Sequence, residues 1–417
     1  MHAGHRPDVA HSSVMKEESL VEQDDHAMAA ARLPVYPDFP LSEYESRYAR
    51  ARAIMASEGL DALLITAETN YIYFTGHHSQ QNPIDKIRPY VLLLPRDGDP
   101  ICIVMPFEEG HVRLTTFIKS VHTYNLLKHN EAIVDAIREC GLASSAIGCE
   151  LGREQYLELS LNDFVDLKSR LPQVDFRDGS SVLLQLRVVK SDAEVERCRA
   201  SAQIAASALE RALGEVRPGN TNIEVAQLVR RYIVEGGGER ATFMAVSSGY
   251  DFTQGKITVP TPRRLEVGDT LTVDTGAQLR GYASDVCRTV VIGKASQKQK
   301  DMYRFVIDLN HVCYEAIRPG NTCADVVRKC MAEVERVGRK TQAVGRIGHG
   351  VGCETTEYPS LSLLDEVEIV PNMVFACNPN FVTDHGFFNS EENLVVTKSA
   401  PQFLSEPIAP SQLRVVG

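Results

Sequence analysis

A five-residue segment occurs twice in the second half of the chain and constrains the fold more than any other feature. Arg-Pro-Gly-Asn-Thr stands at 217–221 and again at 318–322, an offset of 101 residues. Each copy follows a long amphipathic stretch, and its threonine is followed three positions later by an acidic residue, the pattern of a helix capping box. Two helix–stop–helix units at a fixed offset indicate an internal duplication. We therefore predict two α/β halves related by a pseudo-twofold axis.

The first half of the chain predicts a separate domain. A total of 417 residues is too long for one ordinary core, so two domains are expected. Residues 42–60 have apolar positions at helical spacing, and short apolar runs bounded by Pro, Asp and Gly follow as buried strands. We expect a mobile tail over 1–40, a smaller α/β domain over 41–186 and a second domain over 187–417.

Charge, hydropathy and cysteine usage exclude several classes of protein. The net charge of −11 and the absence of a basic stripe argue against nucleic-acid binding. No apolar run reaches about 18 residues, and the N-terminal segment has no apolar core typical of a secretory signal, so no membrane span is expected. The ten cysteines form no CxxC pair or regular framework. They are therefore expected to be reduced thiols of a cytoplasmic protein.

Two aspartates mark a hairpin in the second half. Alternating apolar runs over 269–293 flank Gln278–Gly281. If the turn is centred on that segment, Asp274 and Asp285 lie directly opposite each other, where like charges are destabilising. Such a pair needs a shared proton or a cation, and two metal ions about 3.5–4 Å apart would suit it. Two solvated aspartates on an edge hairpin remain the alternative.

Three further polar residues come from other expected strands. His349 lies in a glycine-rich stretch, Glu391 precedes a strand, and Asn378 ends one. Glycine lets the backbone approach closely, and imidazole offers a neutral nitrogen ligand, although a single histidine is more often structural. Oxygen ligands with one imidazole suit Mn, Fe, Co or Zn rather than a thiolate site.

This arrangement resembles the pita-bread metallohydrolases, a family that includes methionine aminopeptidase, prolidase, aminopeptidase P and creatinase. The family pattern is two aspartates eleven residues apart, a Gly-His-Gly-x-Gly stretch, a glutamate before a proline and a glutamate before the last strand. Asp274, Asp285, His349 and Glu391 match it. The resemblance covers about 190–400, and 42–180 is similar to the N-terminal domain of prolidases and creatinases. It implies a pita-bread domain after a smaller α/β domain, and one or two divalent ions.

The chain also departs from the pattern of the family's peptidases. Asn378 stands where they have a glutamate ligand; its carbonyl oxygen can ligate a metal but brings no charge. Thr356 precedes Glu357 where they have His-Glu. A substrate-binding histidine of the family falls near Lys256, where this chain has none. If the Lys256 ammonium reached the acidic cluster, it would replace the metal.

The resemblance implies a metal-dependent hydrolase like Xaa-Pro dipeptidase or aminopeptidase P, which cleaves a C–N amide bond of a small peptide or amino-acid derivative. The alternatives are a creatinase-like or ectoine-hydrolase-like enzyme, a dimethylsulfoniopropionate-lyase-like enzyme, and, less favoured, a non-catalytic binding protein.

The resemblance also implies roles for single residues. Asp285 and Glu391 are expected to bridge the ions, and Glu357 to act as an acid/base or orienting residue. Arg88, His77 and Lys256 are candidates for binding substrate, Arg88 through the carboxylate. A homodimer is expected, in which the Gly76–Arg88 loop of one subunit reaches the other's site.

Overall fold

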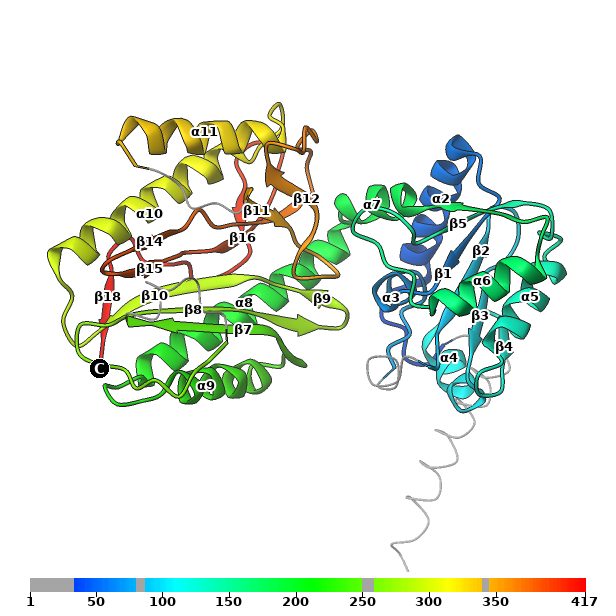
Figure 1. Ribbon diagram of the computed structural model, residues 1–417, viewed down its shortest axis with the longest axis horizontal. Helices are drawn as coiled ribbons and strands as arrows, with labels where there is room; N and C mark the ends of the chain where they lie inside the picture. Colours follow the sequence, from blue (N-terminus) through cyan, green and yellow to red (C-terminus); the bar gives the residue numbers. More distant parts are fainter. Residues whose placement is uncertain (1–33, 80–86, 250–258, 340–344) are drawn as a thin grey trace, which may run out of the picture. The chain divides into compact units, whose positions relative to one another are not determined.

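The computed structural model describes residues 34–79, 87–249, 259–339 and 345–417, and the chain divides into two compact units, Met1–Leu183 and Leu184–Gly417 (Figure 1). Most of the tail expected over 1–40 lies outside the described residues. The boundary between the units falls three residues before the one expected from the sequence. None of the helices in the described ranges is long and apolar enough to cross a membrane.

The N-terminal unit is built on a six-stranded mixed sheet in the order β4-β3-β2-β1-β5-β6. Its strands are β1 Ala62–Ile65, β2 Val91–Pro95, β3 Ile101–Val104, β4 Ser120–Thr123, β5 Ala146–Cys149 and β6 Asp175–Asp178. Its helices are α2 Leu41–Glu58, α3 Glu68–Thr75, the 3₁₀ turn η1 Pro106–Glu108, α4 Glu109–Thr115, α5 His129–Glu139 and α6 Leu161–Arg170. Strands β1, β2, β3 and β5 are buried at every position, as expected for strands covered on both faces.

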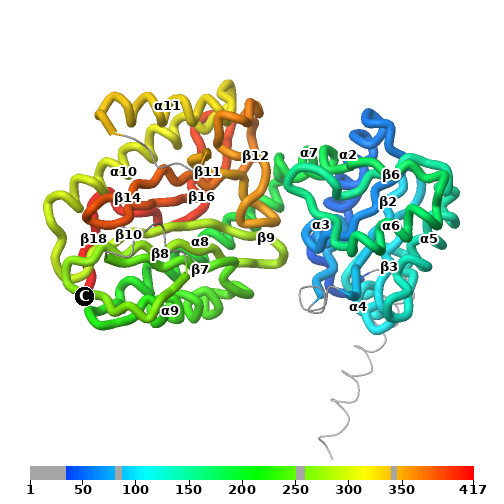
Figure 2. The backbone as a smooth tube through the Cα atoms, in the orientation of Figure 1, coloured from blue at the N-terminus to red at the C-terminus, as the bar shows by residue number. Residues whose placement is uncertain are grey.

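The C-terminal unit contains two halves, each with two helices and a sheet (Figure 2). Helix α7 Ser180–Val188 leads into it. The first half contains α8 Asp192–Glu215, α9 Asn222–Glu235, β7 Arg240–Ser248, β8 Thr270–Leu279, β9 Tyr282–Ala283 and β10 Val286–Ile292. The second half contains α10 Gln297–Ala316, α11 Cys323–Arg336, β11 Arg346–Gly350, β12 Glu357–Ser362, β13 Val374–Cys377, β14 Phe381–Thr383, β15 Gly386–Phe388, β16 Glu392–Val395 and β17 Gln402–Phe403. The last strand, β18 Arg414–Val416, returns to the first half and pairs with β10.

The predicted duplication is confirmed in the backbone hydrogen bonds. Thr221 and Thr322 each begin the second helix of their half with a complete capping box. Next to Thr221, the amide of Asn222 donates to the carbonyl of Arg263 over 3.1 Å; next to Thr322, the amide of Cys323 donates to the carbonyl of Val367 over 2.9 Å. The two repeats therefore occupy equivalent positions. In each half, the first residue of the second helix is hydrogen-bonded to an extended segment that follows later in the same half.

The hairpin register differs from the predicted one. The turn consists of Arg280 and Gly281, both at positive φ (46° and 75°), which is the geometry of a two-residue type I′ turn. Strand β8 consequently pairs Asp274 with Cys287 rather than with Asp285. Moving the turn centre by one residue moves the pairing by two, so Asp285 is a diagonal neighbour of Asp274 on the same face of the sheet. The prediction that the two aspartates lie directly opposite each other was therefore wrong.

Candidate metal centre

Three of the predicted ligands converge in the C-terminal unit. Asp285 lies between β9 and β10, His349 lies on β11, and Glu391 immediately precedes β16. Each offers one ligand atom within 4.8 Å of the others, and all three residues are buried. The Nε2 atom of His349 is 3.4 Å from Asp285 Oδ2 and 3.9 Å from Glu391 Oε1. Strands from both duplicated halves therefore contribute to one cluster.

Backbone pairing holds the two acidic residues in place. The amides of Cys287 and Glu391 each donate to the other's carbonyl over 3.3 Å, which joins β10 to the segment before β16. The side chain of Asn393 accepts from the Asp285 amide over 3.0 Å and donates to the Asp285 carbonyl over 2.7 Å. Asn393 was missed in the sequence, because a polar residue inside a strand gives no sign of which backbone it will meet.

The histidine is oriented by its own strand. His349 Nδ1 lies 3.0 Å from the carbonyl of Gly350, so Nδ1–H donates there and the lone pair of Nε2 faces the carboxylates. Burial lowers the pKa of His349 to about 4, so the ring is neutral at physiological pH. The residue before it must be glycine, because a β-carbon at Gly348 would lie 2.3 Å from the carbonyl oxygen of Ala376 on β13. The neutral His349 ring, with Nδ1 held by the Gly350 carbonyl and Nε2 free of a proton, is in the state that a metal-binding imidazole requires.

Asp274 and Asn378 lie beside this group. Asp274 is buried on the same face of the hairpin as Asp285, and its charge acts on the His349 ring. The side chain of Asn378 meets Glu391 through its nitrogen: Nδ2 donates to Glu391 Oε2 over 2.7 Å. The sequence predicted that Asn378 would offer its carbonyl oxygen as a ligand. In the structure its amide group holds one oxygen of Glu391, and the ligand role of its carbonyl oxygen stays a prediction.

Glu357 lies in a buried ion-pair cluster. Its Oε2 accepts from Arg187 Nη2 and its Oε1 from Lys190 Nζ, both over 2.6 Å, and Lys190 also donates to the Arg187 carbonyl. Burial acts to raise the pKa of Glu357, but Lys190 and then Arg187 outweigh it and lower the pKa below the usual range. Glu357 is therefore an ionised carboxylate. Arg187 and Lys190 lie at the start of the second predicted domain and were not among the predicted site residues.

The substrate-binding candidates have different outcomes. Lys256 lies outside the described residues. Arg88 is half-buried in the N-terminal unit, with its guanidinium 5.8 Å from the centre of the Phe107 ring. The role of His77 in binding substrate stays a prediction. Its ring is fully buried within the N-terminal unit and faces Glu108 and His111.

The donor set fits a divalent ion. Two buried carboxylates and a neutral imidazole nitrogen meet at ligand spacing, with a third carboxylate, that of Asp274, on the same face. Carboxylates this close must raise their pKa values, share a proton or bind a cation. Oxygen ligands with one imidazole suit Mn, Fe, Co or Zn.

The ion pair at Glu357 generates a stability prediction. Lys190→Met should lower the free energy of unfolding by about 3 kcal/mol, because it leaves a buried carboxylate with one partner fewer. The folded-state pKa of Glu357 is depressed, so this contribution is present above the unfolded pKa of about 4.3 and is lost as the pH falls through the folded value. Urea unfolding from neutral to acidic pH measures the difference from wild type, which should shrink on acidification.

The matched control is Lys294→Met at an exposed position of the same unit, which should change stability by no more than about 0.5 kcal/mol. Equal losses for the two variants, or a difference that grows on acidification, would contradict the ion-pair explanation.

Comparison with known proteins identifies the family. Metallopeptidase family M24 matches residues 196–398, and the creatinase/prolidase N-terminal domain matches residues 47–189. An Xaa-Pro dipeptidase of Pyrococcus furiosus is 25% identical over 360 residues, covering 84% of this chain and 95% of that protein.

Solved structures share the fold over nearly the whole chain. An Xaa-Pro dipeptidase from Bacillus anthracis superposes with a TM-score of 0.79 at 22% identity, covering 89% of this chain and all of that one. Dipeptidase PepE from Mycobacterium ulcerans gives 0.78 at 25% identity, covering 91% and 99%. The chain belongs to metallopeptidase family M24, with a pita-bread domain after a creatinase/prolidase N-terminal domain, and is an enzyme of the metallohydrolase class.

Proposed function

We propose that this enzyme is a metal-dependent Xaa-Pro dipeptidase or a close variant that cleaves the C–N amide bond of a small peptide. The observation that carries the proposal is the buried convergence of Asp285, His349 and Glu391 in an M24 domain. The relatives named Xaa-Pro dipeptidase, which align over most of both chains, support this substrate class.

The metal proposal assigns Asp274, Asp285, His349 and Glu391 as ligands of one or two divalent ions, with manganese the first candidate. An ion bound there supplies a water of lowered pKa as nucleophile and polarises the carbonyl. His349 contributes a nitrogen already free of its proton, and the carboxylates of Asp285 and Glu391 supply negative charge. Because Asn378 engages Glu391 Oε2, only Oε1 faces His349, and this favours a single ion.

Glu357 is proposed to position the histidine rather than to transfer protons. It pairs with Gly350, the residue after His349, and its two cationic partners keep it ionised. A carboxylate with two cationic partners is a weak base and has no proton to give. Fixing the start of β12 in turn fixes the strand that carries His349.

The substrate and assembly proposals rest on the family resemblance. We propose a cytoplasmic homodimer in which the Gly76–Arg88 loop of one subunit completes the site of the other. Arg88 would bind the carboxylate of the peptide through its guanidinium, and Lys256 would stand near the position of the missing histidine.

A second candidate is a non-peptidase small-molecule enzyme of the same fold, hydrolase or lyase. Two departures from the family pattern favour it. Asn378 stands where the peptidases have an acidic ligand, and Thr356 stands where they have a histidine. Both changes lie at or next to the site, where they alter its charge and its proton-transfer groups.

Activity should depend on metal and on Asp285. Purified enzyme should hydrolyse Xaa-Pro dipeptides with Mn²⁺ and lose this activity on chelation. Asp285→Ala should lower kcat/KM by at least about 10³-fold, since metal activation supplies several kcal/mol. Asp308→Ala, at an exposed aspartate of α10, is the control and should match wild type. Full activity with metal content near zero would overturn the metalloenzyme proposal. Turnover of N-methylated or cyclic amino-acid derivatives but not Xaa-Pro would favour the second candidate.

Asn378→Glu should tighten metal binding by about tenfold, which is about 1.4 kcal/mol. The new carboxylate adds a ligand but meets Glu391 at the place where the amide donated, so the metal-free form should become less stable. Competition with a chelating dye measures affinity, and thermal unfolding with and without metal measures stability. Asn378→Gln keeps the amide and is the control. A metal affinity unchanged from wild type would show that position 378 does not face the ion.

The dimer proposal predicts complementation between two inactive variants. Arg88→Ala and Asp285→Ala should each lower activity, and a 1:1 mixture after subunit exchange should regain about one quarter of wild-type activity, because half of its dimers then hold one intact site out of two. Light scattering at micromolar concentration gives the oligomeric state. A monomer, or a mixture no more active than its parts, would contradict the shared site.

A further inference from the structure

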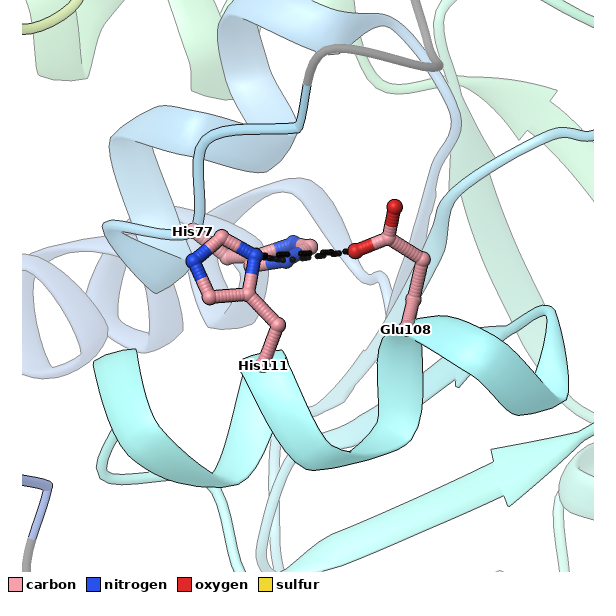
Figure 3. Close-up of side chains that lie close together, drawn as sticks. All are labelled: His77, Glu108 and His111. Carbon is pink, nitrogen blue, oxygen red and sulfur yellow. Dashed lines mark hydrogen bonds and ion pairs between the residues drawn. The ribbon is translucent and has the colours of Figure 1, made fainter.

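A second cluster of ligand-type side chains lies in the N-terminal unit. His77 follows α3, Glu108 ends η1, and His111 lies on α4 (Figure 3). His77 Nε2 is 3.3 Å from Glu108 Oε2 and 3.2 Å from His111 Nδ1, and His111 Nδ1 is 3.6 Å from the same Glu108 oxygen. One atom from each side chain thus forms a nearly equilateral triangle.

The size of this triangle matches one face of a tetrahedral metal site. Zinc binds imidazole nitrogen and carboxylate oxygen at about 2.0–2.2 Å, so two ligands at the tetrahedral angle stand about 3.3–3.6 Å apart. The three observed separations, 3.2, 3.3 and 3.6 Å, fall at or within about 0.1 Å of this range.

The hydrogen bonds at the back of the cluster are compatible with a neutral His77 ring whose Nε2 faces the other two ligand atoms. The hydroxyl of Tyr71 donates to Cys102 Sγ, and its oxygen lies 3.3 Å from His77 Nδ1. With the ring proton on Nδ1, Nε2 presents its lone pair toward the Glu108 oxygen 3.3 Å away, and this is the tautomer that metal binding requires. A proton on His111 could bridge part of the triangle, but one proton cannot serve all three of its edges. A cation at the centre of the three atoms satisfies all of them.

The remaining groups fix the ligands and leave a path to solvent. The other oxygen of Glu108, Oε1, accepts from Ser79 Oγ and Tyr90 OH, both over 2.8 Å, which directs Oε2 to the histidines. The side chain of His77 is fully buried, whereas that of His111 is 49% exposed. Within this unit the cluster is closed on the His77 side and accessible at His111, where an ion can enter and a water can complete its coordination.

We propose that His77, Glu108 and His111 form a zinc-binding site with three protein ligands and one water. Two imidazoles and a carboxylate suit a borderline metal, and the tetrahedral spacing selects zinc. The site belongs to a different compact unit from the Asp285–His349–Glu391 centre and does not depend on the proposed peptidase activity. A bound ion would link the residue after α3 to α4, and so stabilise the packing of these segments.

The test counts zinc in the full-length Asp285→Ala variant, which weakens the C-terminal centre. Protein stripped with chelator is reloaded with zinc, desalted and analysed for metal, and cobalt loading is followed by its visible spectrum. When His111→Ala is added to Asp285→Ala, the bound zinc should fall by about one equivalent per chain. The cobalt-loaded double variant should also lack the intense visible bands of tetrahedral cobalt. His111 is half exposed, so this variant should keep its fold. The matched control, His122→Ala, replaces another histidine of the same unit and should remove none.

The difference of one zinc equivalent between chains with and without His111 decides the proposal. Equal zinc content in the two variants overturns it, and so does the absence of bound zinc in Asp285→Ala at micromolar zinc. Should Asp285→Ala fail to fold, the same subtraction between wild type and His111→Ala applies. A loss of peptidase activity with this one-equivalent difference intact would leave the N-terminal site standing.

Discussion

Two buried carboxylates beside a neutral imidazole are the constraint on which the C-terminal unit depends. Charged groups taken out of water are costly unless they are paired, hydrogen-bonded or metal-bound. The fold must therefore fix the positions of Asp285 and Glu391 through the contacts of their backbone. It does so through the paired amides of Cys287 and Glu391 and through the Asn393 side chain. Asp285 comes from the first duplicated half, and His349 and Glu391 come from the second. Neither half contains the site alone, so the duplication is a condition for the chemistry.

A second set of buried charges supports the first. Glu357 with Arg187 and Lys190 fixes the start of β12, whose first residue pairs with Gly350 beside His349. The close approach leaves no room for a side chain at Gly352, where a β-carbon would lie 2.3 Å from Glu357 Oε1. Strand β11, which carries His349, is thus supported by buried polar contacts at the start of β12. Away from water, each of these contacts is stronger than it would be at the surface.

The sequence predicted features that are local or repeated, and it was wrong or silent where distant segments meet. The repeated capping threonines follow from residues three positions apart, and they predicted the two halves correctly. The register of Asp274 depended on which two residues form the turn, and Arg280 at positive φ gives no sequence signal. The ion pair between Lys190 and Glu357 joins residues 167 apart, and such contacts cannot be inferred from spacing. The burial of the His77 ring beside Glu108 and α4 is likewise a tertiary property that the sequence pattern does not show.

The adjacent residues Glu391 and Glu392 show how the same side chain acquires opposite roles. Neighbours along an extended strand face opposite sides of the sheet, so only one of the two can reach the cluster. Glu392 turns away to the buried guanidinium of Arg288, and it also accepts from the amide of Ala409. Glu391 has Asn378 as its donor instead, a neutral amide rather than a cation. A full positive charge beside Glu391 would cancel the negative potential that attracts a metal ion. The amide fixes the carboxylate while leaving its charge available to the site.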